Sequence, residues 1–377
     1  MKDWSKISHQ KVNKTVNMND LTSIINIHPY SISQKEKEEI YLNFLLDLTN
    51  HHLKQSPQYK KIIDVLGIKI DAINTIENIP FIPVRLFKDF ELLSVDRSEV
   101  VKTMTSSGTS GQSVSKIFLD RTTASNQTKV LAKIVSSFIG GKRLPMLVVD
   151  SSAIVKDRAL FSARGAGVLG FSMLGYDVTY ALDENMELNI EKVQAFLRNH
   201  GDEQILVFGF TFIVWQHFYN ELKKYNIRLG LDQGIMIHGG GWKKLADQAV
   251  DNETFKSEIK QTTGISRIYN YYGMVEQTGS IFMECEKGFL HSSLFSDVLI
   301  RNFKDFSLAP LGVPGLIQLL SLLPQSYPGH SIITEDIGEI VGIDDCFCGR
   351  MGKYFRVHGR IKNSETRGCS DAYESRR

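Results

Sequence analysis

A run of hydroxyl-bearing residues and glycines is the segment of this sequence best suited to hold phosphate. It comprises, in order, Thr105, Ser106, Ser107, Gly108, Thr109, Ser110 and Gly111. Glycine permits a tight turn that points backbone N–H groups inward, and the hydroxyls add further donors for a polyphosphate. The order is not that of a P-loop, whose lysine directly follows the second glycine; here Gln112 takes that place and Lys116 comes later. Because a solvated loop has the same composition, the assignment needs support from elsewhere in the chain.

Two further motifs each follow an apolar run that reads as a strand. The first places Gly240 within a glycine triplet, and the second contains Tyr272, Gly273 and Glu276. Ligands bind where strands of an open α/β sheet end. There an aromatic ring can stack on a base, and a carboxylate can hold Mg²⁺ beside a triphosphate. The alternative is a plain glycine turn, core tyrosines and a solvated glutamate.

Two charged residues later in the chain complete a set that could bind a nucleotide. Asp336 follows an apolar run, where a carboxylate can bind ribose hydroxyls. Arg360 follows a glycine, and its guanidinium can pair with phosphate in a bidentate manner.

The four cysteines all lie in the last quarter of the chain. In a reducing compartment this favours metal binding or thiol chemistry over disulfides. Three sulfurs and one imidazole form a candidate structural Zn²⁺ set, although a Cys-x-Cys pair is tighter than the usual knuckle. Small buried cysteines beside a surface histidine are the alternative. The four candidate ligands are Cys285, His291, Cys346 and Cys348.

The composition is that of a globular protein. The 377 residues are 42% hydrophobic and 23% charged, with a formal net charge of +2, which gives no sign of a nucleic-acid surface. The N-terminus has no apolar signal region, and the most apolar later stretch, 316–323, is too short to span a bilayer. We therefore expect a cytoplasmic protein without a membrane span.

Hydrophobic periodicity predicts the elements that position these residues. The first 75 residues read as helical, with a clear helix over 36–53, and a helical N-terminal region is expected over 1–98. Beyond it, strands alternate with helices, which predicts an α/β core with a largely parallel sheet. We expect a large domain over 1–341 and a short C-terminal segment over 342–377. The predicted strands are 144–149, 205–210, 234–237 and 266–271, and the predicted helices are 189–198 and 212–225.

In their order along the chain, these motifs resemble the adenylate-forming superfamily, which includes acyl-CoA synthetases, luciferases and nonribosomal adenylation domains. The resemblance implies an α/β large-domain fold with mixed and parallel sheets. It makes 105–111 the triphosphate loop, Tyr272 to Glu276 the adenine and Mg²⁺ motif, Asp336 the ribose-binding acid and Arg360 the start of a hinge. ATP and Mg²⁺ are the implied cofactors.

Three departures from the superfamily pattern are present. Val275 stands where the family usually has threonine, and Lys362 stands at a hinge position that is more often aspartate. The sequence ends at Arg377, so we expect it to lack a full C-terminal lid domain and the lysine carried there.

The run 272–281 and the tail around Cys369 are similar to the acyl-protein synthetase family, the long-chain fatty acid ligases of the bacterial luciferase fatty-acid-reductase complex. The resemblance implies ATP-dependent activation of a fatty acid to acyl-AMP, with Glu276 and Lys116 in the catalytic centre. It also implies transfer of the acyl group to Cys369 as a thioester. The implied partners are an acyl-protein reductase and an acyltransferase subunit.

Two other functions remain open on the sequence. One is an acid–CoA ligase of the phenylacetate type, which would use free CoA as the acceptor. The other is a non-catalytic subunit that binds nucleotide or acyl groups. The identity of the acid and any role in luminescence are not encoded in a recognisable motif.

Overall fold

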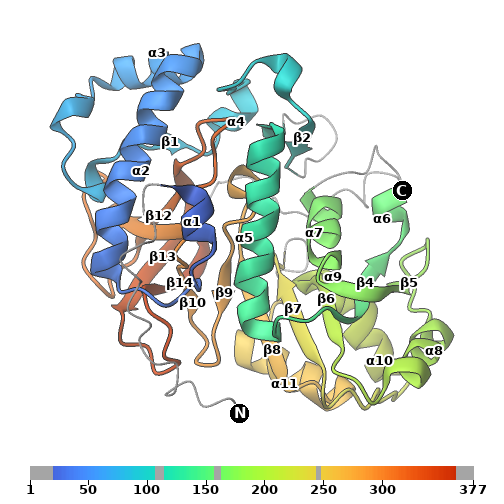
Figure 1. The fold of residues 1–377 in the computed structure, drawn as a ribbon. Coiled ribbons are helices and arrows are strands. Elements are labelled where there is room, and N and C mark those ends of the chain that lie inside the picture. The colour runs from blue at the N-terminus through green and yellow to red at the C-terminus, as the bar shows by residue number, and fades with distance from the viewer. Residues whose placement is uncertain (1–19, 107–113, 157–162, 243–247, 362–377) are drawn as a thin grey trace. The chain divides into compact units, whose positions relative to one another are not determined.

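The computed structural model describes residues 20–106, 114–156, 163–242 and 248–361 (Figure 1). The chain divides into two compact units. Unit 1 comprises Met1–Met104, Ser113–Ile134 and Gly273–Glu365, and unit 2 comprises Thr105–Gln112, Val135–Tyr272 and Thr366–Arg377. Among the described residues, no helix combines the length and the apolarity that a bilayer crossing requires.

Unit 2 contains a parallel sheet in the order β8-β7-β6-β4-β5. β4, β6 and β7 are buried runs of mainly apolar residues, as expected for strands that are covered on both faces, whereas β5 and β8 also contain polar residues and are partly exposed. The strands are β4 (Leu144–Ser151), β5 (Gly175–Leu182), β6 (Leu206–Phe210), β7 (Ile235–Gly239) and β8 (Arg267–Tyr272). The helices are α6 (Ala153–Lys156), α7 (Ala163–Ser172), α8 (Ile190–His200), α9 (Thr211–Ile213), a π-helix (Val214–Tyr219), α10 (Asn220–Lys224) and α11 (Asn252–Thr263).

Aromatic contacts show how helices cover the two faces of this sheet. On one face, Phe171 of α7 stacks on Phe208 of β6, with ring centroids 4.2 Å apart. On the other, Phe255 of α11 packs on His238 of β7 at 4.4 Å. The strands predicted at 144–149, 205–210, 234–237 and 266–271, and the helices predicted at 189–198 and 212–225, are confirmed.

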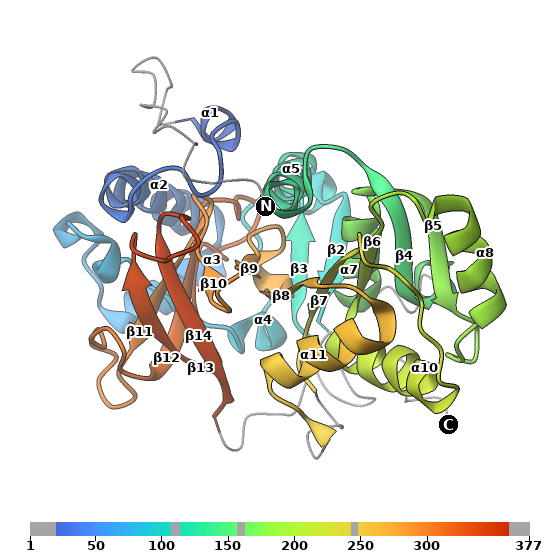
Figure 2. The same cartoon turned by 90° about the horizontal axis from the view of Figure 1, so that it is seen from below.

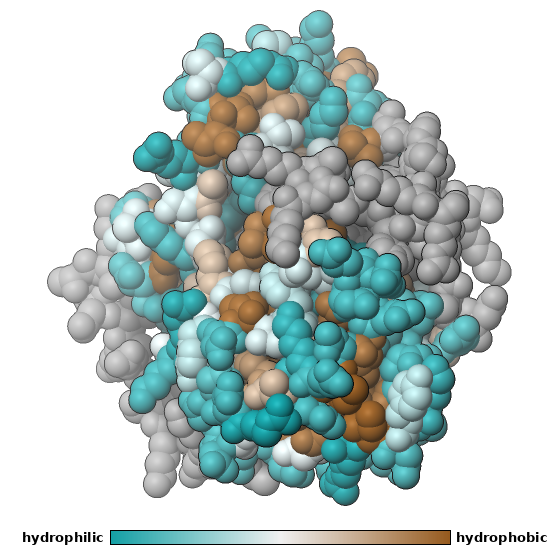
Figure 3. All heavy atoms as spheres, turned by 90° about the vertical axis from the view of Figure 1, so that its right-hand side faces the viewer, coloured by the Kyte–Doolittle hydropathy of each residue, from teal (hydrophilic) through white to brown (hydrophobic). Residues whose placement is uncertain are grey.

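The surface of unit 2 mixes polar and apolar residues. Figure 3 views the side on which β5 and α8 lie in Figure 1, where hydrophilic residues surround separate hydrophobic patches. Large apolar side chains are exposed at Leu169 of α7, at Met173 between α7 and β5, and at Tyr176 of β5. Single exposed apolar residues of this kind are normal on a folded protein.

Unit 1 contains a largely antiparallel sheet in the order β11-β12-β13-β14-β10-β9, and β1 joins β13 in parallel (Figure 2). We did not predict these strands from the sequence: β1, β9 and β10 have only two or three residues, and the pairing of the others depends on contacts distant in sequence. The strands of unit 1 are β1 (Ile82–Pro83), β2 (Lys102–Thr105), β3 (Lys116–Leu119), β9 (Phe282–Glu284), β10 (Leu290–His291), β11 (Ser296–Arg301), β12 (Gly315–Ser321), β13 (Ser331–Ile343) and β14 (Lys353–Arg360). The last residue of β2, Thr105, belongs to unit 2.

The internal strand β14 comes from the segment that we expected to be a short C-terminal appendage. It pairs with β13 on one side and with β10 on the other, so residues 353–360 are an integral part of the sheet of unit 1. The remainder of that segment, 362–377, lies outside the described residues.

The N-terminal part of unit 1 contains several helices. The helix predicted over 36–53 is confirmed as α2, whereas residues 1–19 of the predicted helical region lie outside the described residues. Ser33 caps α2 by accepting a hydrogen bond from the backbone N–H of Glu36, while the Glu36 side chain accepts from the Ser33 N–H. This capping box satisfies two N–H groups that a helix start leaves free. The helices are α1 (Leu21–Ile25), α2 (Gln34–Gln55), α3 (Pro57–Leu66), α4 (Leu86–Asp89) and α5 (Arg121–Ile139), which continues into unit 2; 3-10 turns lie at Ile70–Ala72, Ile76–Asn78, Arg97–Glu99 and Val275–Gln277.

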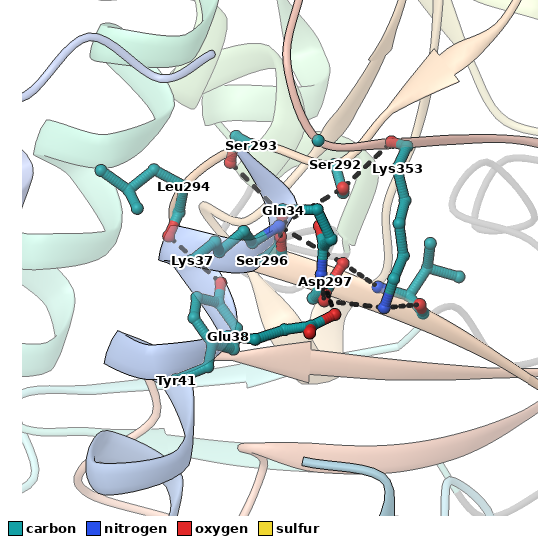
Figure 4. A network of polar contacts seen from close by, with 12 residues as sticks. Gln34, Lys37, Glu38, Tyr41, Ser292, Ser293, Leu294, Ser296, Asp297 and Lys353 are labelled. Atoms are coloured by element: carbon teal, nitrogen blue, oxygen red, sulfur yellow. Dashed lines mark hydrogen bonds and ion pairs between the residues drawn. The ribbon is translucent and has the colours of Figure 1, made fainter. Parts of the chain in front are cut away.

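A buried charge cluster fastens α2 to the sheet of unit 1 (Figure 4). Asp297 of β11 lies 3.3 Å from Lys37 of α2 and 3.0 Å from Lys353 of β14, measured from carboxylate oxygen to ammonium nitrogen. Gln34 donates a third contact to Asp297 at 2.9 Å. Burial alone would raise the pKa of Asp297, but the two ammonium groups hold it at about 2. Burial also lowers the pKa of Lys37 to about 8.

Candidate functional site

The ends of the candidate phosphate loop are held by a two-stranded sheet of β2 and β3. Thr105 ends β2 and is half-buried together with Ser106, whereas Lys116 begins β3 and is exposed. The Lys116 ammonium lies 3.8 Å from the Glu91 carboxylate. An exposed pair of this kind contributes little to stability and leaves the lysine able to change partners. The central loop residues, Ser107, Gly108, Thr109, Ser110 and Gly111, lie outside the described residues.

Glu276 is a buried carboxylate in the 3-10 turn Val275–Gln277, only 6% exposed. Burial raises its pKa above the usual range, while a hydrogen bond from Ser115 and the more distant charges of Lys88 and Arg360 act in the opposite direction. Asp297 forms two ion pairs, whereas the Glu276 carboxylate forms none within 4.0 Å with any basic side chain of the described residues. A buried carboxyl group with incomplete charge compensation is suited to receive a cation.

The backbone around Glu276 is fixed by three side chains that sequence reasoning missed. The Tyr327 hydroxyl donates to the Glu276 carbonyl at 2.9 Å, and Gln127 donates to the same hydroxyl at 3.3 Å. The Gln277 amide donates to the carbonyls of Leu319 and Gly329 at 3.2 and 2.8 Å. Tyr327 and Gln127 lie far from Glu276 in the sequence, and Gln277, although it belongs to the run 272–281, is a residue type that does not by itself indicate a positioning role.

Gly279 explains why the motif 272–281 contains a second glycine. Its φ is +89°, which side chains rarely adopt, and a Cβ atom there would lie 2.6 Å from the backbone oxygen of Gln127. The glycine therefore lets the turn bearing Glu276 pack directly against α5.

Asp336 and Arg360 form the second polar pair of unit 1. They are register partners on β13 and β14, and the Arg360 Nε lies 2.9 Å from an oxygen of Asp336. Asp336 is mostly buried, whereas Arg360 remains partly exposed at the end of its strand. The sequence separated these residues by 24 positions, and antiparallel pairing of the two strands brings them together.

In unit 2, Gly240 and Tyr272 lie at the carboxyl ends of the neighbouring strands β7 and β8. Gly239 and Tyr271, which precede them, are paired in register. Gly240 has a φ of +81°, and Tyr272 is half-buried. In unit 1, Gly273 follows Tyr272 and is also half-buried. Parallel strands thus place the glycine turn and the aromatic motif of unit 2 at one edge of its sheet.

His238, at the end of β7, is part of the core. It is buried, shares a hydrogen bond of 2.9 Å with Thr211, and packs on Phe255. Burial lowers its pKa to about 3, so the imidazole is neutral at physiological pH. Although His238 directly precedes the glycine triplet, its burial and its contacts give it a structural role in the core.

The candidate metal ligands converge in unit 1. The sulfur atoms of Cys285, Cys346 and Cys348 and a ring nitrogen of His291 all lie within 4.8 Å of one another. These residues come from the β9–β10 hairpin and from the loop between β13 and β14. The fourth cysteine, Cys369, lies outside the described residues.

The fold defines the class of protein. The chain is similar to the crystal structure of an open conformation of 2-hydroxyisobutyryl-CoA ligase in complex with 2-HIB-AMP and CoA, with a TM-score of 0.68, 15% sequence identity, and coverage of 89% of this chain and 78% of that one. This similarity establishes the mixed α/β fold of adenylate-forming acyl-CoA ligases, as the sequence predicted.

The sequence defines the family within that class. The model of the family described as "Acyl-protein synthetase, LuxE" matches residues 5–376, so the chain belongs to this family. Two relatives are each named long-chain-fatty-acid–luciferin-component ligase. The one from Vibrio harveyi is 22% identical over 354 residues, which cover 91% of this chain and 89% of the relative. The one from Aliivibrio fischeri is 23% identical over 360 residues, covering 91% and 90%.

Proposed function

We propose that this protein activates a long-chain fatty acid with MgATP and then carries the acyl group as a thioester on its own Cys369. The observation that carries the proposal is the buried Glu276 carboxyl, with its raised pKa, in a chain of the LuxE family. Burying a carboxylate without a close cation lowers stability, and a functional role for Glu276 explains why a carboxylate occupies this position. The family relationship supplies the class of reaction.

Each candidate residue has a defined task in the first step. Loop residues 105–111 and Lys116 would hold the β- and γ-phosphates, and Glu276 would hold Mg²⁺, whose charge offsets that of the triphosphate. Asp336 would bind the ribose hydroxyls, with Arg360 fixing the orientation of that carboxylate. Tyr272 would stack on the adenine, and Gly240 would let the backbone approach the nucleotide closely. Positioning and charge neutralisation supply most of the acceleration in such phosphoryl chemistry.

The chemistry would proceed in two balanced steps. The fatty acid carboxylate attacks the α-phosphorus of ATP, which forms the acyl–phosphate bond and releases pyrophosphate. The Cys369 thiolate then attacks the acyl carbon, which forms the thioester and releases AMP. A reductase partner would consume the thioester, and an acyltransferase partner would supply the acid. A thiol acceptor is compatible with the reducing cytoplasm.

A CoA ligase is the second candidate function, because a solved structure with this fold is a ligase in complex with CoA. This alternative shares the adenylation step and differs only in the acceptor. A non-catalytic binding subunit would perform neither step.

The test of the first step is release of pyrophosphate from MgATP in the presence of tetradecanoic acid, with acyl-AMP detected by mass spectrometry. We expect both products with the wild type and with Glu335→Gln, a matched control one residue from Asp336. We expect neither product with Glu276→Gln. ATP binding by the wild type without pyrophosphate release, across acids of several chain lengths, would contradict the proposal and favour a binding subunit.

A further inference from the structure

The ligand atoms of Cys285, His291, Cys346 and Cys348 have the spacing of a metal site. The Cys285 and Cys346 sulfurs are 4.0 Å apart, and the Cys348 sulfur is 3.3 Å from Nε2 of His291. With Zn–S bonds near 2.3 Å and Zn–N bonds near 2.0–2.1 Å, the edges of a tetrahedron measure about 3.5–3.8 Å. The four ligand atoms lie no more than 4.8 Å apart, so side-chain shifts of about 1 Å would bring them all to bonding distance from one Zn²⁺ ion.

The backbone around the cluster has the form of two short turns that present sulfur. The Cys285 sulfur accepts a hydrogen bond from the N–H of Lys287, at 3.4 Å, and the Cys348 sulfur accepts one from the N–H of Arg350, at 3.5 Å. Each donor lies two residues after its cysteine. Such N–H groups stabilise negative charge on sulfur, the form in which a thiol binds metal.

A purely hydrophobic explanation accounts for only part of this arrangement. Cys285 and Cys346 do pack against Tyr354 in a small apolar cluster. Small apolar cysteines, however, would not require an imidazole nitrogen to point at a third sulfur from a fully buried ring. A borderline-soft ion such as Zn²⁺ matches three thiolates and one imidazole, whereas Mg²⁺ and Ca²⁺ prefer oxygen.

We propose that Cys285, His291, Cys346 and Cys348 bind one structural Zn²⁺ ion that joins the β9–β10 hairpin to the loop between β13 and β14. All four coordination positions are filled by protein atoms, so the site is closed and takes no part in catalysis. Zinc binding to the four ligands displaces the three thiol protons to solvent.

The site secures the loop that connects β13 to β14, the two strands that carry Asp336 and Arg360. Asp344 in this loop accepts hydrogen bonds from the backbone N–H groups of Gln34, at 2.9 Å, and Gly352, at 2.7 Å. The loop therefore also holds the start of α2. Arg360 lies at the far end of β14, and its register partner Asp336 lies near the middle of β13.

The first test is metal analysis of the full-length protein, purified without chelator, by elemental and native mass spectrometry. We expect about one zinc ion per chain. Cys346→Ser and Cys348→Ser should lose it, whereas two matched controls should keep it. Phe347→Ser alters the residue between the two cysteines, whose side chain is 95% exposed, and Cys369→Ser removes the one cysteine that is not among the proposed ligands.

A second measurement keeps the proposal falsifiable if the cysteine variants fail to fold. Replacement of zinc by Co²⁺ in the wild type should give the visible absorption of a tetrahedral thiolate complex. Strong chelation should lower Tm and speed hydrogen exchange over 285–291 and 344–352.

Three results would overturn the proposal. They are a wild-type protein that holds no zinc even after reconstitution, zinc that survives both cysteine substitutions in folded protein, and a Cys285–Cys346 disulfide in freshly isolated protein. None of these results bears on adenylation, which the pyrophosphate assay tests separately.

Discussion

Two buried carboxylates of unit 1 have opposite electrostatic surroundings. Asp297 has two ammonium groups within 3.3 Å, and its pKa falls to about 2 (Figure 4). Glu276 is equally removed from water, and its pKa rises because nearby charges compensate burial only in part. The comparison separates a carboxylate that holds elements together from one that, as we propose, receives a cation supplied with the substrate.

The largest expected effect is on stability, at Asp297. Asp297→Asn leaves the ammonium groups of Lys37 and Lys353 buried without their counter-ion, and we expect a loss of about 3–5 kcal/mol in the free energy of unfolding. Urea denaturation followed by circular dichroism measures it. Glu39→Gln, an exposed position on α2, should change the free energy little. Equal effects of both variants would remove the structural role assigned to the cluster.

The next effect is on activity, at Glu276. Glu276→Gln should lower the rate of acyl-AMP formation about a hundredfold or more, equivalent to roughly 2.7 kcal/mol of barrier. It should also raise Tm at neutral pH, because it removes a buried charge that opposes folding. Steady-state pyrophosphate release and a thermal melt provide the two readings. A variant that is both inactive and less stable would show that Glu276, like Asp297, stabilises the fold.

A smaller effect is expected at the Asp336–Arg360 pair. Asp336→Asn retains the size of the side chain but loses the charge that would accept ribose hydroxyls, so we expect the KM for ATP to rise about tenfold. The Glu335→Gln variant, on the opposite face of β13, serves as its control. An unchanged KM with a lower Tm would show that the pair only joins β13 to β14.

The smallest effect is the pH dependence of stability, where the two carboxylates have opposite signs. The folded-state pKa of Asp297 lies below its usual 3.8, so its stabilisation is present above pH 3.8 and is lost as the pH falls toward 2. The pKa of Glu276 is raised, so the protonated form favours folding below pH 4.5, and this contribution is lost as the pH rises through the folded pKa. Melting curves across pH for the wild type, Asp297→Asn and Glu276→Gln should show each slope disappear in its own variant.

The sequence predicted unit 2 more completely than unit 1. Runs such as 144–149 and 205–210 are continuous and apolar, and turn residues bound them, so each local pattern already indicates a buried parallel strand. The strands β9 and β10 have three and two residues, and the pairing of β14 between β13 and β10 depends on contacts distant in sequence. Local periodicity contains no information about such pairing.

The candidate site was predictable where a residue type carries its chemistry. Glu276 and the four candidate metal ligands were predicted from residue type and spacing, and the structure brings the ligand atoms of those four residues within 4.8 Å of one another. The residues that position Glu276 were not found, because a tyrosine at 327 and glutamines at 127 and 277 are ordinary residues until folding places them beside it.

The central claim is tested most directly by labelling purified wild type and Cys369→Ser with radioactive tetradecanoic acid and MgATP, followed by denaturing electrophoresis and neutral hydroxylamine. We predict label that requires ATP, is released by hydroxylamine and is missing from the variant, while both proteins form acyl-AMP. Hydroxylamine-sensitive label of equal strength on the Cys369→Ser variant, or acyl-AMP formation with no labelled protein in either sample, would contradict the account.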